Sequence, residues 1–98
     1  MRGLYCLTEL LSREFDSVID VGCGDYEHSE IFKTYGKSVT GISLREPCDI
    51  KGDFMSVDVP KADCIWACHV LEHQLNVHDF LNRCFDLSDL VAITVPPP

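Results

Sequence analysis

Short apolar segments recur along the chain, and each has the length of a buried β-strand. They cover residues 18–21, 38–43, 50–54, 62–67 and 90–95. Apolar runs of this length, bounded by Gly, Pro, Ser or Asp, predict strands. Three prolines follow the last run. They should end that strand, because proline has no N–H for a sheet ladder.

Three other segments have helical periodicity, each with an apolar stripe. The stripes are Leu4, Leu7 and Leu11; Ile31, Phe32 and Tyr35; and Val77, Phe80, Leu81, Cys84 and Phe85. We expect Gly36 to cap the end of the second helix, and Asn76 with Asp79 to cap the start of the third. Alternating strands and helices predict an α/β fold, a Rossmann-like doubly wound parallel sheet of about five strands with flanking helices.

The first predicted strand runs directly into a glycine turn at Gly22 and Gly24. Glycine lets the backbone approach a ligand closely, and the helix that follows directs unpaired N–H groups to the same place. In doubly wound sheets, ligands bind beyond the carboxyl ends of the strands. The pattern therefore predicts a nucleotide-type cofactor site built from residues 22–26, 43–46 and 68–73.

Composition narrows the functional class. The chain has 98 residues, 46% of them hydrophobic, with a net charge of −8 and no cluster of basic residues. Such a balance is typical of a single globular domain and disfavours binding to nucleic acid or anionic membranes. The run 90–95 is too short to span a bilayer, and Glu9 and Arg13 interrupt the apolar start that a signal peptide would need. We expect a cytoplasmic protein with a small-molecule substrate.

The six cysteines include no C-x-x-C pair. They are interpreted as small buried hydrophobic residues in a reducing compartment. Cys64, Cys68, His69 and His73 are the nearest approach to a metal cluster, with the two histidines expected on one helix face. A closed zinc site needs about four converging ligands. Cys64 is expected in mid-strand, away from the histidines, so we predict no metal site.

Four segments together resemble class I S-adenosylmethionine-dependent methyltransferases of the small-molecule type. They are residues 19–24, 39–43, 52–54 and 64–73, and the resemblance extends from about Phe15 to Pro97. It implies S-adenosylmethionine as the cofactor and methyl transfer to a small-molecule or glycan-like acceptor.

The resemblance also implies roles for individual residues. The implied cofactor-binding set is Asp20, Gly22, Cys23, Gly24, Ser43, Leu44, Asp53, Phe54, Cys68 and His69. In the family the glycine turn holds the methionine portion, and Asp20 would help to hold its ammonium group. Asp53 would accept a hydrogen bond from the adenine amino group, and the Cys68–His69 backbone would border the sulfonium. His69 and His73 are the candidates for a general base, because histidine titrates near neutral pH.

The chain departs from the family pattern at three places. Tyr26 stands where a third glycine is usual, and Ser43 where an Asp or Glu usually holds the ribose hydroxyls. Losing charge-assisted bonds there would cost about 1–3 kcal/mol, unless Glu46 replaces them. Two further strands would normally follow the fifth, so residues 1–98 are interpreted as a single truncated domain. A bare apolar edge at 90–95 predicts a homodimer, or a fragment of a longer chain.

Other interpretations stay open. The chain could be a non-catalytic relic or fragment that binds the cofactor weakly or acts as an interaction module. A dehydrogenase-like nucleotide binder is disfavoured by the missing third glycine and the arginine-poor loop after the second strand. Individually, Asp20 could merely cap the turn, Asp53 could be a solvated loop acid, and the two histidines could be structural.

Overall fold

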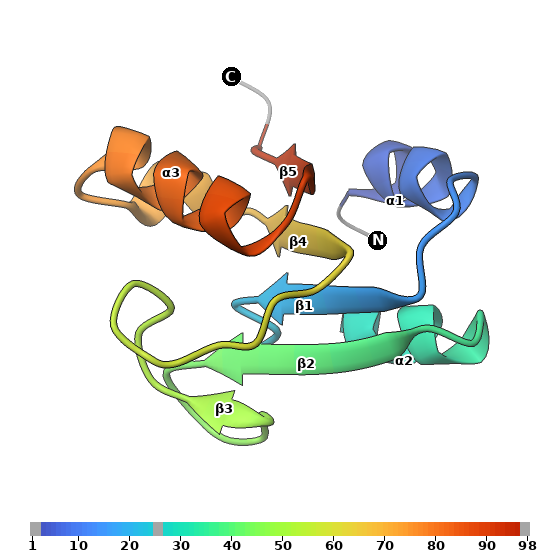
Figure 1. Cartoon of the computed structure of the whole chain (residues 1–98), viewed down its shortest axis with the longest axis horizontal. Coiled ribbons are helices and arrows are strands. Elements are labelled where there is room, and N and C mark those ends of the chain that lie inside the picture. The colour runs from blue at the N-terminus through green and yellow to red at the C-terminus, as the bar shows by residue number, and fades with distance from the viewer. Residues whose placement is uncertain (1–2, 25–26, 97–98) are drawn as a thin grey trace.

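The computed structural model describes residues 3–24 and 27–96. Within this part of the chain, five parallel strands form one sheet in the order β3-β2-β1-β4-β5 (Figure 1). The strands are β1 (Ser17–Val21), β2 (Ser38–Ser43), β3 (Ile50–Lys51), β4 (Cys64–Cys68) and β5 (Leu90–Thr94). The helices are α1 (Leu4–Leu11), α2 (Glu27–Thr34) and α3 (Val77–Leu87), with a short 3-10 helix, η1 (Leu71–His73). The predicted Rossmann-like α/β fold is confirmed.

The central strand β1 is the point at which the strand order reverses. Its last residue, Val21, pairs with Ile42 of β2 on one side and with Ala67 of β4 on the other. The carboxyl ends of three strands therefore meet next to the glycine turn. This is the topological switch point, where doubly wound sheets bind their ligands.

Each face of the sheet carries its own apolar cluster. Alternate residues of a strand point to opposite faces, so Val18 belongs to one cluster and Ile19 to the other. The Val18 cluster includes side chains of α1 and α2, and the Ile19 cluster includes Phe80 and Cys84 of α3. Helices on both faces make the fold a three-layer sandwich, as a parallel sheet requires.

The third and fourth strands differ from their predicted bounds. The third ends at Lys51, because Gly52 adopts φ 145° and residues 53–57 close into a hydrogen-bonded turn. The fourth begins at Cys64, which is the residue that pairs with Val18 of β1. Cys64 is thus the first residue of its strand, and the prediction that it lies in mid-strand is wrong.

Both predicted helix caps are confirmed. Gly36 adopts φ 79°, and the N–H of Lys37 after it donates to the carbonyl oxygen of Phe32 at 3.0 Å. Asn76 Oδ1 accepts a hydrogen bond from the Asp79 N–H at 3.0 Å, which satisfies an amide that the first turn of α3 would leave unpaired.

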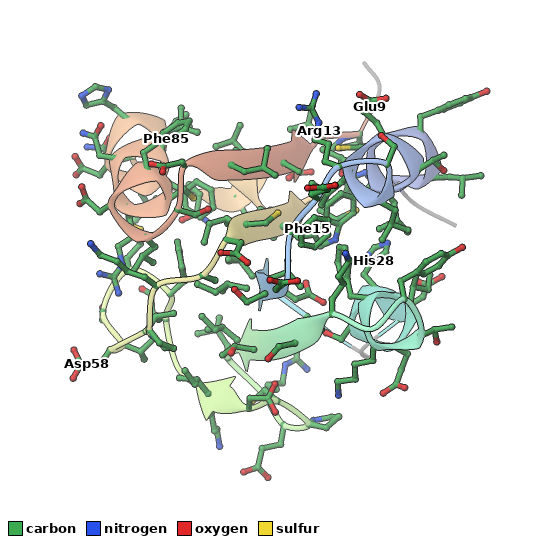
Figure 2. All side chains as sticks on the ribbon, turned by 45° about the vertical axis from the view of Figure 1, so that its right-hand side comes forward. Glu9, Arg13, Phe15, His28, Asp58 and Phe85 are labelled. Carbon is green, nitrogen blue, oxygen red and sulfur yellow. The ribbon has the colours of Figure 1, made fainter. Side chains whose placement is uncertain are left out.

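The buried helix stripes are narrower than the sequence suggests. In α1 the buried residues are Leu7 and Leu10, while Leu4 is 55% exposed. Tyr35 lies beyond the end of α2 and is exposed. Val77 and Phe85 of α3 are exposed too, and Figure 2 shows Phe85 among the outward side chains of that helix. Only two or three residues of each of these short helices are buried against the sheet.

The fifth strand is less bare than the sequence predicts. All five residues of β5 are half-buried, because α1 contacts the strand on one face and α3 on the other. In the described part of the chain, its outer edge has no strand partner. No helix among the described residues is long and apolar enough to cross a membrane.

Candidate functional site

A cavity of about 660 Å³ lies at the carboxyl ends of β1, β2 and β4. It contains eight of the residues that the sequence pointed to: Gly22, Ser43, Leu44, Asp53, Phe54, Cys68, His69 and His73. Nine further residues line it: Val21, Ile42, Gly52, Met55, Val70, Gln74, Leu75, Asn76 and Asp79. A larger hollow of about 800 Å³ lies at the amino ends of the strands, the end where doubly wound sheets do not bind their cofactors.

The glycine turn forms one wall of the cavity through Gly22. The Gly22 N–H donates to the Ile42 carbonyl at 2.8 Å, and this bond fastens the turn to the end of β2. Gly22 adopts φ 71°, and a Cβ added there would lie 2.9 Å from Cγ2 of Val70. The position therefore requires glycine for its backbone conformation and also for the space around it. Cys23 and Gly24 follow in the turn but do not line the cavity, and Tyr26 lies outside the described residues.

Asp20 is buried behind the turn. It is 2% exposed, does not line the cavity, and its Oδ2 accepts a hydrogen bond from Ser29 Oγ of α2 at 2.6 Å. Burial raises the pKa of Asp20 to about 6, although the bond from Ser29 and the charge of His28 act in the opposite direction. In this position Asp20 ties the end of β1 to the start of α2. Its contact with a cofactor ammonium group stays a prediction.

The end of β2 presents a hydroxyl where the family has a carboxylate. Ser43 is half-buried, and its Oγ accepts a hydrogen bond from the Arg45 N–H at 3.2 Å. Leu44 is 71% exposed beside it. Glu46 is exposed and does not line the cavity, so it does not replace the missing acid in this arrangement.

Residues 53–57 form a tight turn, called the 53–57 turn below. Asp53 Oδ1 accepts from the Met55 N–H at 2.9 Å, and the Asp53 carbonyl accepts from the N–H groups of Ser56 and Val57. Asp53 is exposed at the cavity, and within the described residues its second carboxylate oxygen has no hydrogen-bond partner. Phe54 is 6% exposed and packs edge-on against Phe80, with ring centroids 5.6 Å apart.

The two predicted histidines follow the end of β4, where they differ in backbone conformation and in secondary structure. His69 adopts φ 57°, a left-handed conformation that is uncommon outside glycine, and its N–H donates to the Thr94 carbonyl at 2.9 Å. His73 is the last residue of η1. The prediction that they share a helix face is wrong, because His69 precedes a helix of one turn. Nevertheless, both line the cavity.

The cysteines at the two ends of β4 are buried thiols. Cys64, the first residue of the strand, is fully buried, and burial raises its pKa. The Cys68 sulfur accepts a hydrogen bond from Thr94 Oγ1 at 3.0 Å. Among the described residues, no group of three or more His, Cys, Asp or Glu side chains is arranged to hold a metal ion.

Sequence reasoning missed mainly the segment from Gln74 to Asp79, which follows the predicted site residues 68–73. Asn76 and Asp79 were identified only as capping residues, yet both also line the cavity. The available signal was their place directly after the fourth strand, since loops at that end of the sheet gather around the switch point.

A parallel 3-2-1-4-5 sheet with a glycine turn and a cavity at its switch point defines a Rossmann-like domain, the class of fold that binds its ligands at this place. The sequence model of a family described as a methyltransferase domain matches residues 4–96. The chain therefore belongs to this methyltransferase family, and membership implies S-adenosylmethionine as the cofactor. No curated protein matches the sequence.

Solved structures share the fold. A SAM-dependent methyltransferase from Archaeoglobus fulgidus superposes with a TM-score of 0.78 at 22% identity, over 100% of this chain and 54% of that one. The plantazolicin methyltransferase BamL gives a TM-score of 0.64 at 19% identity, over 88% and 39%. The mitomycin 7-O-methyltransferase MmcR gives 0.67 at 16% identity, over 98% and 37%. The chain spans about half, or less, of the length of these proteins.

Proposed function

We propose that the cavity binds S-adenosylmethionine, and that the chain carries the cofactor-binding part of an enzyme that methylates a small-molecule or glycan-like acceptor. The observation that carries this proposal is the convergence of eight predicted residues, from four separate segments, on one cavity. Two proteins of the same fold are described as plantazolicin and mitomycin methyltransferases, which favours a small-molecule acceptor.

The wall residues suit the parts of this cofactor. Gly22 leaves room for the methionine portion, and Asp53 offers a free carboxylate oxygen to the adenine amino group. Asp79 adds a second acid to the wall, and opposite charge lowers the cost of burying a sulfonium cation. The bound cofactor supplies an electrophilic methyl group.

The protein's part in methyl transfer is largely to align the acceptor with the methyl group. His69 and His73 stand at the cavity at the end of β4, and either would take the proton from a hydroxyl acceptor. The unusual backbone of His69, pinned by the Thr94 carbonyl, favours His69 as the residue under functional constraint.

The second candidate function is a non-catalytic domain that binds the cofactor weakly or acts as an interaction module. Ser43, which offers no carboxylate to the ribose, is the observation that favours it.

Calorimetry with S-adenosylhomocysteine, under reducing conditions, separates these two functions. We expect micromolar binding if the cavity is a working cofactor site, because most of its wall is already in place. Absence of binding at millimolar ligand would contradict the enzyme and support the relic. Adenosine triphosphate is the control ligand, since it shares the adenosine and lacks the methionine portion.

We further expect self-association through the outer edge of β5. This edge of an apolar strand has no partner among the described residues, and such edges favour pairing with another chain. Sedimentation velocity across a range of micromolar concentrations should report a dimer. A single monomeric species throughout that range would contradict the proposed homodimer.

A further inference from the structure

The 53–57 turn belongs to a long connection without regular secondary structure. The connection runs from the end of β3 at Lys51 to the start of β4 at Cys64. It has no ladder or helix of its own. Backbone hydrogen bonds hold its two ends, because the Gly52 N–H donates to the Ser43 carbonyl at 2.8 Å and the Ala62 N–H donates to the Leu87 carbonyl at 3.2 Å. Side-chain contacts from other elements fix the part between them. Those contacts also fix Asp53 and Phe54, which line the cavity.

Hydrogen bonds within the turn satisfy three of its amide groups, whereas two of its carbonyl groups are paired with another element. The N–H groups of Met55, Ser56 and Val57 all donate to Asp53. The carbonyls of Phe54 and Val57 face α3, where both accept from one side chain, Arg83.

Arg83 holds the turn at three points. Its Nη2 donates to the Val57 carbonyl at 2.6 Å, its Nε donates to the Phe54 carbonyl at 3.3 Å, and its guanidinium carbon lies 5.6 Å from the centre of the Phe54 ring. Arg83 is half-buried, where charge-assisted bonds are stronger than in open solvent. Phe80, one helical turn earlier on α3, packs against the same Phe54 ring.

We propose that Arg83 is a positioning residue for the cofactor site: from α3 it sets the 53–57 turn so that Asp53 and the Phe54 backbone face the adenine. Arg83 does not line the cavity, so it acts through the turn and not by contact with the ligand. This inference rests on the proposed function, namely that the cavity binds S-adenosylmethionine.

The role calls for arginine and not merely for a positive charge. Two donors in a rigid planar fork reach two carbonyls at once, while the guanidinium carbon stays 5.6 Å from the centre of an aromatic ring. Lysine carries the same charge on a compact ammonium group, without the fork or the flat face. Arg83→Lys therefore keeps the charge and most of the stem but loses the geometry.

The experiment compares Arg83→Lys with wild type and with the control Arg13→Lys. Arg13 lies on the surface just after α1 beside Glu9, 3.4 Å away, and does not line the cavity (Figure 2). Hydrogen exchange of the ligand-free proteins should show faster exchange in the segment 52–57 of Arg83→Lys alone. Its affinity for S-adenosylhomocysteine and for 5′-methylthioadenosine should fall by about tenfold, since the weakened contacts are at the adenine end.

The outcomes separate the two proposals. Unchanged exchange at 52–57, or affinity within twofold of wild type, would overturn the role of Arg83. Absence of binding by wild type, with faster exchange in Arg83→Lys, would overturn the proposed function and leave Arg83 as the anchor of the turn. If Arg83→Lys does not fold, Arg83→Gln, which is neutral and keeps an amide donor, takes its place with the same expected direction.

Discussion

Replacement of Gly22 by valine is expected to abolish binding of S-adenosylhomocysteine. Gly22 adopts φ 71°, where an L side chain is strained by about 1–2 kcal/mol. An added Cβ would lie 2.9 Å from the Val70 methyl carbon Cγ2, and valine adds two more methyl groups at the cavity wall. Loss of the turn's shape should reduce affinity by at least about 100-fold, the equivalent of about 3 kcal/mol, as measured by calorimetry.

The matched control is Gly36→Val. Gly36 adopts φ 79°, so a side chain there suffers the same backbone strain. Apart from its chain neighbours, no atom of the described residues lies within 4 Å of an added Cβ, and Gly36 does not line the cavity. Gly36→Val should lower the melting temperature and retain binding. A milder pair of substitutions tests the steric clash between a side chain at position 22 and Val70. Gly22→Ala should weaken binding, and adding Val70→Ala to the same chain should restore part of the affinity. Unchanged affinity in Gly22→Val would contradict a cofactor site at this turn.

Asp20→Asn is expected to stabilise the fold at neutral pH. Burial raises the pKa of Asp20 from 3.8 to about 6, so the folded state disfavours the charged carboxylate that the unfolded chain readily forms. The penalty is fully present above pH 6 and amounts to about 3 kcal/mol. Asparagine carries no charge, and its side-chain oxygen can still accept the hydrogen bond from Ser29.

The direction in which the stability difference between Asp20→Asn and wild type changes with pH tests this explanation. Between about pH 4 and pH 6 the folded state binds more protons at Asp20 than the unfolded state does, so the contribution of Asp20 to the stability of wild type falls as pH rises through this window. Urea denaturation should therefore show Asp20→Asn more stable than wild type at pH 8, with the advantage shrinking steadily from pH 6 to pH 4. An advantage that does not vary with pH would contradict a buried, raised-pKa carboxylate.

Asp63→Asn serves as a control, because it should change stability in the opposite direction. The Asp63 carboxylate is exposed and accepts from the N–H groups of Asp16 and Ser17, which lowers its pKa. Its contribution to stability is present above the unfolded pKa and is lost as pH falls, so Asp63→Asn should destabilise the protein at neutral pH.

The affinity of Asp20→Asn for the cofactor then tests whether Asp20 contacts the ammonium group. Weaker binding in a more stable variant supports contact with the ammonium group, and unchanged binding supports a purely structural role.

Local pattern predicted most elements of the described part of the chain. Strand-length apolar runs and helical stripes predicted its five strands and three α-helices, with Gly36 and Asn76 at the expected caps, but not the exact bounds of β3 and β4 or the short helix η1. The reason is that strand and helix periods, and the capping groups, act over a few residues only. The resemblance of residues 19–24 and 64–73 to known methyltransferases also indicated the family.

Contacts between distant segments decided how the site is built. The sequence named Asp20 beside the glycine turn, but the alternation of β1 directs its side chain toward Ser29 of α2, away from the cavity. It paired His69 with His73 on a helix, whereas the left-handed backbone of His69 places it before η1.

The sequence by itself therefore determined the order of elements, the parallel α/β class and eight of the seventeen residues that line the cavity. Only the tertiary structure decided that Asp20 is buried and that Arg83 holds the 53–57 turn through carbonyls up to 29 residues away in sequence. Periodicity shows which face of an element is buried, because that depends on neighbours a few positions away. Which carbonyl an arginine reaches depends on how a long connection folds over a distant helix, and no local pattern records that.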